Sequence, residues 1–281
     1  MNVITIMDFR SAEKPEGAEG LQYHIACKPG DLERYVLLPG DPERVLKIMA
    51  LWDKGSEIAF HREYRSATGT YKGTGISACS TGIGSPSTGI AIEELANIGC
   101  DTLIRVGSCG AIREGIECGD LIIDAAAVRM EGTSKQYVRT EYPAYASYEV
   151  TLALIEACEA LGFRYHMGVS ASTDSFYTGQ GRKGHGGYST SESERLVEDL
   201  RRAGVTNFEM EAAALFVLSS IYGLRAGCVC TVFADRLGNT FKTVGEETSA
   251  RAACEAVKIL KEWDELKEKK GKKNFYPSLL R

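Results

Sequence analysis

The sequence predicts a single α/β domain, and three observations support this fold class. Apolar stretches of strand length alternate with segments of helical periodicity along most of the chain. The segment 76–112 has the order strand, glycine-rich turn, helix, strand and second glycine-rich turn. The 281 residues contain no internal repeat and no shift in composition that would mark a domain boundary. We therefore expect residues 1–20 to be a flexible extension and residues 21–281 to be one domain that ends in a helix and a basic tail.

The composition argues against several classes of protein. A net charge of −5 with 44% hydrophobic residues is typical of a soluble protein and disfavours a general nucleic-acid or membrane-surface binder. No apolar run approaches the roughly 18 residues of a membrane helix, and no signal peptide is recognisable, so we expect a cytoplasmic location. The nine cysteines form no CxxC pair, which indicates reduced thiols. Cys228 and Cys230 lie in an apolar run, and we expect them on one face of a strand rather than at a metal.

The first expected strand is 34–38, and it ends at a turn that contains Gly40. Asp41 follows as the expected cap of a helix that begins at Pro42, because aspartate accepts hydrogen bonds from free N–H groups at a helix start. This places Arg44 in the first turn of the helix, close to the end of the strand. The turn therefore combines glycine and arginine, although an exposed arginine beside a solvated cap would have the same pattern.

A hairpin and a βαβ unit are expected next. Strands at 64–70 and 74–79 pair through Lys72-Gly73, and the second strand leads into a glycine-rich turn. The segment 85–98 has helical periodicity, with serines and a proline at its start, and we expect these hydroxyls to cap it. Gly99 closes this helix, since glycine tolerates the left-handed conformation that follows many helices.

The strand expected at 103–106 introduces the strongest indication of a ligand site. It carries Arg105 into a turn expected at 107–110, where Ser108 adds a hydroxyl among small residues. An arginine in an apolar strand needs a partner charge, and small residues leave backbone N–H groups open to an anion. We expect an anion site at this sheet edge. The alternative is that the glycines only form tight turns.

The second half of the chain continues the alternation. We expect strands at 120–124 and 227–233, helices at 148–161, 212–222 and about 246–266, and a solvated basic stretch at 267–273. The loop 175–182 carries an aromatic ring, an amide and a guanidinium at Phe176, Gln180 and Arg182. Such a set could stack on and read a planar heterocycle, although an ordinary surface loop is the alternative. The Gly/Ser-rich residues 183–192 are expected to be flexible.

Two carboxylates precede the helix at 212–222. Glu209 and Glu211 flank Met210, and both can face a ligand if the backbone there is extended. Carboxylates accept hydrogen bonds from a ribose diol well. Acidic residues also favour helix N-termini for purely structural reasons, so this pattern alone leaves both interpretations open.

Six segments together resemble the nucleoside phosphorylases, in particular their uridine phosphorylase branch. The matching segments are LLPGDPERV at 37–45, HRE at 61–63, CSTGIGSPSTGIAIEEL at 79–95, LIRVGSCGAI at 103–112, STDSFYTGQGR at 172–182 and NFEMEAAAL at 207–215. They follow the order of the family and span about residues 21–260. The resemblance implies a three-layer αβα sandwich around a mixed, partly barrel-like sheet.

The resemblance also implies a site for phosphate and a nucleoside. Its phosphate residues would be Gly40, Arg44, Arg105 and Ser108, with Arg62 from a neighbouring subunit. The ribose residues would be His24 across the interface, Met210 and Glu211, and the base residues would be Phe176, Gln180, Arg182 and Glu209. Arg105, Glu211, Arg182 and Gln180 would carry the catalysis.

Family members assemble as dimers, commonly three dimers in a hexamer. The resemblance therefore implies self-association, phosphate as a co-substrate and no required cofactor. A monovalent cation such as potassium would lie between subunits at Glu63, Ile83 and Ser87.

The implied reaction is the reversible phosphorolysis of uridine to uracil and α-D-ribose 1-phosphate. Ser108 stands where the family usually has threonine, which keeps the hydroxyl. Asp235-Arg236 stands where the uridine branch usually has Asn-Arg, so a purine nucleoside phosphorylase with Asp235 as general acid is the alternative. Two further alternatives are a nucleosidase that uses water and a non-catalytic nucleoside-binding protein. The three arginines argue against both.

Overall fold

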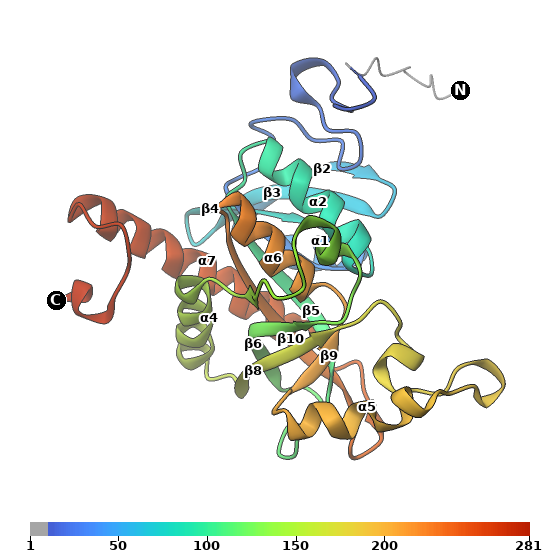
Figure 1. The fold of residues 1–281 in the computed structure, drawn as a ribbon. Helices are drawn as coiled ribbons and strands as arrows, with labels where there is room; N and C mark the ends of the chain where they lie inside the picture. Colours follow the sequence, from blue (N-terminus) through green and yellow to red (C-terminus); the bar gives the residue numbers. More distant parts are fainter. Residues whose placement is uncertain (1–10) are drawn as a thin grey trace.

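The computed structural model describes residues 11–281, which form three layers (Figure 1). A large mixed β-sheet lies in the middle. The helices α2 (Ser85–Asn97) and α6 (Ala212–Tyr222) cover one face, and α1 (Pro42–Met49), α4 (Tyr148–Leu161) and α7 (Glu246–Lys269) cover the other. Each face buries its own apolar core against these helices. The arrangement confirms the predicted three-layer αβα fold.

The sheet of the described residues contains eleven strands and partly closes on itself. The strand order is β11-β10-β6-β8-β9-β5-β1-β4-β3-β2, with β7 paired to β6, and β10 also pairs with β5. The strands β5, β10, β6, β8 and β9 therefore form a closed ring, as predicted for a partly barrel-like sheet. The bounds are β1 (Tyr35–Leu38), β2 (Lys54–His61), β3 (Tyr64–Tyr71), β4 (Thr74–Cys79), β5 (Thr102–Ala111), β6 (Leu121–Arg129), β7 (Ala144–Tyr145), β8 (Tyr165–Ser172), β9 (Asn207–Glu209), β10 (Arg225–Asp235) and β11 (Thr240–Phe241).

The βαβ unit at the centre is confirmed with two corrections. The first concerns the start of α2, where the N-cap is Gly84 and no side chain caps the helix. The Ser85 hydroxyl instead donates to the carbonyl oxygen of Met210 at 2.8 Å, which ties the helix to the segment before α6. Gly99 adopts a φ of 95°, as expected for a residue that closes a helix.

The second correction concerns residues 107–110, which are strand and not turn. Strand β5 continues to Ala111 because β10 runs parallel beside it, with Cys230 opposite Gly107 and Thr231 opposite Ser108. The glycine at 107 serves close packing: a Cβ there would stand 2.7 Å from Cys230 Sγ and 2.8 Å from Arg105 Nη2.

Several elements escaped the sequence prediction. Strand β2 precedes the predicted hairpin, and α3 (Thr133–Tyr137) and α5 (Ser191–Arg202) were not expected. Helix α5 begins inside the stretch predicted to be flexible, where Thr190 caps it by accepting from the Ser193 N–H. The predicted solvated basic stretch is also wrong at its start, because Lys267 is buried and donates to Glu149 Oε2 at 2.6 Å.

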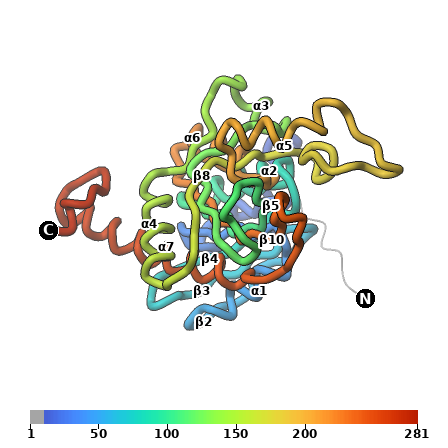
Figure 2. Tube along the Cα trace, turned by 90° about the horizontal axis from the view of Figure 1, so that it is seen from below, coloured from blue at the N-terminus to red at the C-terminus, as the bar shows by residue number. Residues whose placement is uncertain are grey.

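The C-terminal end of the chain lies away from the central layers. The end of α7 and the segment after it project from the body in two views (Figures 1 and 2). In the predicted extension, residues 1–10 lie outside the described residues, and Glu16 forms an isolated bridge with Gln22. All nine cysteines are free, and eight are buried. None of the helices in 11–281 combines the length and apolar character needed to cross a bilayer.

Candidate active site

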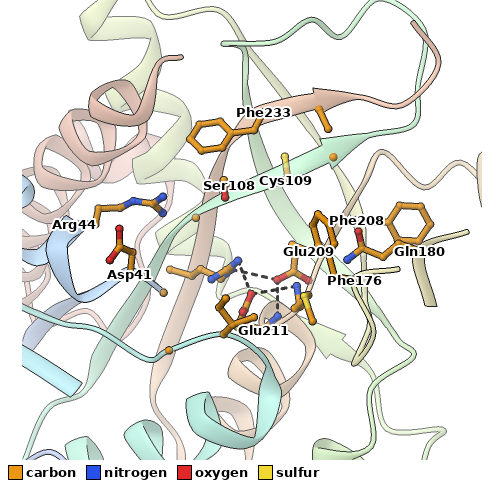
Figure 3. A pocket seen from close by; sticks show the side chains of 18 of the residues that line it. Asp41, Arg44, Ser108, Cys109, Phe176, Gln180, Phe208, Glu209, Glu211 and Phe233 are labelled. Carbon is orange, nitrogen blue, oxygen red and sulfur yellow. Dashed lines mark hydrogen bonds and ion pairs between the residues drawn. The ribbon is translucent and has the colours of Figure 1, made fainter. Parts of the chain in front are cut away.

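A cavity of about 460 Å³ opens where several strands end (Figure 3). Its walls come from the turns after β1 and β4, from β5, from the loop after β8, from β9 and from β10 and β11. Eleven of the predicted site residues line it: Gly40, Arg44, Ile83, Arg105, Ser108, Phe176, Gln180, Arg182, Glu209, Met210 and Glu211. Residues more than 160 positions apart in the sequence thus share one cavity.

One end of the cavity is cationic. Arg44 is buried in the first turn of α1, where its Nε donates to Glu246 Oε1 at 2.8 Å and its Nη1 donates to the Val106 carbonyl at 3.1 Å. These two hydrogen bonds orient the guanidinium, and neither of them involves Nη2. The Asp41 carboxylate accepts from the Glu43 N–H at 2.9 Å and caps the helix, as predicted. Ser108 lies close to Arg44 in the view of Figure 3.

A second arginine, Arg105, lies fully buried against two carboxylates. Its Nη2 is 2.5 Å from Glu211 Oε2, and its Nε is 3.2 Å from Glu209 Oε2, an ion-pair contact without hydrogen-bond geometry. Burial opposes the charge, but Glu211 and Glu209 hold the pKa of Arg105 above its ordinary range. The guanidinium therefore stays charged inside the protein, as the sequence argument for a partnered arginine requires.

The two carboxylates are held differently. Glu209 Oε2 accepts from the N–H groups of Glu211 at 2.8 Å and Ala212 at 2.7 Å, and its Oε1 accepts from the Ser172 hydroxyl. Glu211 Oε1 accepts from the Gly84 N–H at 2.6 Å, and its Oε2 faces Arg105. Glu209 thus supports the arginine and the start of α6, whereas Glu211 lies between the two ends of the cavity in Figure 3.

The other end of the cavity joins an aromatic ring, an amide and a guanidinium, as predicted. Arg182 lies 4.0 Å over the Phe176 ring, and its Nη1 donates to the Phe176 carbonyl at 2.7 Å and to Gln180 Oε1. Arg236 donates to the Gln180 carbonyl at 2.9 Å and so anchors the loop that follows β8. Burial and the nearby Arg236 lower the pKa of Arg182 to about 10, which still leaves it charged at neutral pH.

Two residues expected to act across a subunit interface do not line the cavity of their own chain. His24 Nδ1 lies 2.6 Å from Glu94 Oε1, and Arg62 Nη2 donates to the Tyr23 hydroxyl at 3.1 Å. Arg62 is exposed in the β2–β3 turn, with a φ of 57°. Neither position brings a side chain to the cavity within this chain.

The three residues assigned to a cation lie together at the edge of the cavity. The Ser87 hydroxyl donates to the Ile83 carbonyl at 3.3 Å. A Cβ on Gly82 would stand 2.9 Å from Glu63 Cγ and 3.3 Å from Ser87 Oγ. The side chains of Glu63 and Ser87 therefore both pack against the backbone of Gly82. The chain therefore supplies a carboxylate, a carbonyl and a hydroxyl in one place.

Asp235 has a different setting from the one a general acid would need. Its Oδ1 accepts from the N–H groups of Leu237 at 3.0 Å and Gly238 at 2.9 Å, which closes the turn between β10 and β11. Neither Asp235 nor Arg236 is among the residues that line the cavity.

Ten lining residues were not assigned to the site from the sequence: Asp41, Pro42, Gly82, Gly107, Cys109, Gly110, Phe208, Phe233, Ala234 and Phe241. Phe233 could have been found, because it lies at the carboxyl end of a predicted strand, where open α/β sheets bind ligands. Phe241 gave no such signal, since only the short return strand β11 brings it to the cavity.

Comparison with known proteins agrees with this geometry. A family model described as "Phosphorylase superfamily" matches residues 34–262. A protein of Thermococcus kodakarensis named uridine phosphorylase is 69% identical over 271 residues, which cover 96% of this chain and 98% of the relative. The uridine phosphorylase of Escherichia coli strain K12 is 40% identical over 243 residues, covering 85% and 95%. A guanosine phosphorylase of Halorubrum lacusprofundi is 40% identical over 211 residues, covering 75% and 82%.

Proposed function

The chain belongs to the phosphorylase superfamily, and we propose that it is a uridine phosphorylase, which cleaves uridine with phosphate to uracil and α-D-ribose 1-phosphate. This proposal rests on one observation: the two ends of a single cavity differ in their chemistry. Arg44, Arg105 and Ser108 form its cationic end, while Gln180 and Arg182 form the end suited to a planar base. The 69% identity to the Thermococcus kodakarensis uridine phosphorylase supports the same substrate.

The cationic end would hold the attacking phosphate. Arg44 and Arg105 are fixed by carboxylates and a backbone carbonyl before any ligand arrives. Catalysis there would consist of positioning and charge stabilisation, because preorganised donors cost little reorganisation during the reaction. Ser108 and the backbone at Gly40 would complete the phosphate contacts.

Glu211 and Met210 would hold the ribose between phosphate and base. The Glu211 carboxylate would accept hydrogen bonds from the sugar hydroxyls and, being negative, favour the oxocarbenium-like centre that forms as the glycosidic bond breaks. The bond electrons pass to the uracil ring. Arg182 and Gln180 would stabilise the charge that develops on its oxygen and nitrogen edge, with Phe176 against the ring.

The proposal is tested by base release from uridine and from inosine, each with and without phosphate. We expect uracil from uridine only when phosphate is present. Release without phosphate would indicate a nucleosidase, and binding of uridine without any turnover would indicate a non-catalytic protein. Either result would contradict the phosphorylase assignment.

A purine nucleoside phosphorylase is the second candidate, and the similarity to the guanosine phosphorylase of Halorubrum lacusprofundi favours it. Its general acid would be Asp235. The hydrogen bonds of that carboxylate to Leu237 and Gly238 speak for a structural role instead. We expect Asp235→Asn to keep uridine cleavage within about threefold of wild type, since an amide oxygen can still close the turn. Efficient inosine or guanosine cleavage that is lost in this variant would favour the purine assignment.

We also propose that the active unit is a dimer in which Arg62 and His24 reach the partner's cavity, as a step toward a hexamer. Two inactive variants, Arg62→Ala and Glu211→Gln, allow a direct test after denaturation and joint refolding. An equal mixture should regain about a quarter of wild-type activity, because half of the sites in mixed dimers receive both intact residues. No recovery in the mixture would contradict a shared site.

A monovalent cation between subunits remains part of the proposal, at Glu63, Ile83 and Ser87, with no other cofactor required. Potassium should raise the thermal midpoint of the wild type more than an equal concentration of a bulky organic cation. Glu63→Gln should abolish that difference, because the amide carries no charge to attract the ion. An equal response of the wild type to both salts would contradict the cation site.

A further inference from the structure

A second cluster of chemically reactive groups lies behind the cavity, between β5, β6 and β10. It consists of the Asp124 carboxylate and the thiols of Cys228 and Cys230, whose ligand atoms all lie within 4.8 Å of one another. All three side chains are fully buried. The Cys228–Cys230 spacing places both thiols on one face of β10, as the sequence predicted, and Asp124 reaches them from the neighbouring strand β6. The sequence favoured such a strand face over a metal site, and the position of Asp124 reopens the metal interpretation.

The two thiols satisfy each other, but the carboxylate of this cluster is only partly satisfied. The Cys228 thiol donates to Asp124 Oδ2 at 3.1 Å and lies 3.7 Å from Cys230 Sγ, where either thiol can be the donor. Asp124 Oδ1 and the nearby amide nitrogen of Asn207 have no hydrogen-bond partner among residues 11–281. The Arg105 guanidinium lies beside the Cys230 sulfur at Gly107, so a positive charge reaches the thiols but leaves Asp124 Oδ1 without a partner in the described range. An unsatisfied buried oxygen is costly, so this atom is the one that a bound cation would satisfy.

The three ligand atoms are spaced close to three of the four corners of a tetrahedral thiolate site. Two sulfurs bound to one zinc ion at about 2.3 Å lie about 3.8 Å apart, and a carboxylate oxygen lies about 3.5 Å from each sulfur. The observed 3.7 Å between the sulfurs matches the first distance, and the observed 3.1 Å to Asp124 needs only a small widening. Two thiolates and one carboxylate suit Zn²⁺ better than a hard cation, because sulfur ligands prefer softer metals.

We propose that Asp124, Cys228 and Cys230 bind one divalent, thiophilic metal ion of the Zn²⁺ class. Binding breaks two S–H bonds, forms two metal–sulfur bonds and one metal–oxygen bond, and releases the two thiol protons, together with any proton held by Asp124, to solvent. The ion also satisfies the carboxylate oxygen that has no partner within residues 11–281. The loaded site keeps a net negative charge that faces Arg105, whose Nη2 and Cys230 Sγ both adjoin the Cα of Gly107.

This site would tie β6 and β10 together beside Arg105 of the main cavity. The thiols donate no group to that cavity, so the metal has a structural role. The proposal does not depend on the substrate assigned above.

The test is the metal content of the full-length protein after expression in zinc-supplemented medium and gel filtration. We expect about one zinc per chain in the wild type and in the control Cys254→Ser, whose thiol is equally buried but lies in the other core. Cys228→Ser and Cys230→Ser should lose it. Zinc-free wild type, or equal zinc in the variants and the control, overturns the proposal.

A second measurement needs no variant and covers the case in which the serine variants fail to fold. The wild type, denatured with a chelator and refolded with Co²⁺, should show a thiolate-to-cobalt charge-transfer band and a higher thermal midpoint than protein refolded without metal. A refolded protein with neither the band nor the shift overturns the proposal.

Discussion

At the scale of single residues, both carboxylate oxygens of Glu209 are held by groups of the protein itself. Its carboxylate accepts two backbone N–H groups at the start of α6 and stands beside Arg105. It was predicted as a base contact from the family resemblance. Because its oxygens are already occupied, we propose that it positions Arg105 instead.

The variant Glu209→Gln tests this role. The neutral amide cannot pair with Arg105, so we expect kcat/KM for phosphate to fall by about 100-fold, since losing one partner of a buried ion pair costs several kcal/mol. The KM for uridine should change much less. Steady-state kinetics with each substrate varied separately measures both.

The control for that variant is Glu198→Gln, which removes a carboxylate that pairs with Arg201 and Arg202 on the surface of α5. It should leave both kinetic constants unchanged. If Glu209→Gln raises the KM for uridine as strongly as that for phosphate, Glu209 contacts the base and the positioning role is wrong.

At the scale of elements, the long strand β5 decides where the arginine points. It continues past Arg105 only because β10 pairs with it over its whole length, and Gly107 lets the two strands carry Cys230 and Arg105 on the same face. A side chain at 107 would collide with both groups. The predicted turn at 107–110 failed for this reason: glycine marks close approach as often as it marks a turn.

We expect Gly107→Ala to displace Arg105 and to destabilise the protein by about 1–3 kcal/mol, as an overpacked core does. Phosphate affinity should fall with it. Thermal unfolding and phosphate saturation measure the two effects. The matched control is Gly110→Ala on the same strand, where a Cβ would meet its nearest neighbour at 3.5 Å, an ordinary contact. Equal loss of stability in both variants would contradict the packing argument.

At the scale of the whole molecule, helix α7 is held by a buried group of charges far from the cavity. Asp264 pairs with Arg225 at 2.7 Å and accepts from the Tyr35 hydroxyl at 2.6 Å, while Lys267 bonds Glu149. Burial opposes ionisation, but Arg225 and Tyr35 hold the pKa of Asp264 well below its usual value. These contacts join the last helix to β1, α4 and β10.

This cluster sets a pH dependence of stability. The folded pKa of Asp264 is below its unfolded value of about 3.9, so the stabilisation is present above pH 4 and is lost as the pH falls below it. We expect Asp264→Asn to lower the thermal midpoint at pH 7 by on the order of 5 °C and to flatten its decline in acid. Glu262→Gln, which breaks a surface pair with Lys258, should do neither. An unchanged acid decline in Asp264→Asn would contradict this account.

The C-terminal segment packs against the same region of α7 and α4. Phe275 stacks on Trp263 with ring centroids 3.8 Å apart, and its N–H donates to Glu149. Phe275→Ala should cost about 3–5 kcal/mol of stability, as large core truncations do, without changing activity at moderate temperature. Tyr276→Ala next to it, at 42% exposure, is the control and should cost little. Denaturation midpoints would decide, and similar losses in the two variants would speak against the stacking.

The sequence by itself determined the α/β alternation, the capped start of α1, the βαβ unit and the residue types of the site. These follow from local periodicity and from turn chemistry, which short stretches of sequence encode. The polar helix α5 escaped because it buries little apolar surface. It is fixed by the Thr190 cap and by the packing of Leu196, Val197 and Leu200 against a small core that includes Phe208 and Ala171.

Only the tertiary structure decided which of those residues meet. Strand pairing between β5 and β10, distant in sequence, brought Cys228, Cys230 and Arg105 to one face and extended a predicted turn into a strand. It also set Glu209 and Glu211 on different nitrogens of Arg105 and gave them different backbone partners, although both looked alike in sequence. Contacts across a sheet depend on register and crossover, and no local pattern specifies these.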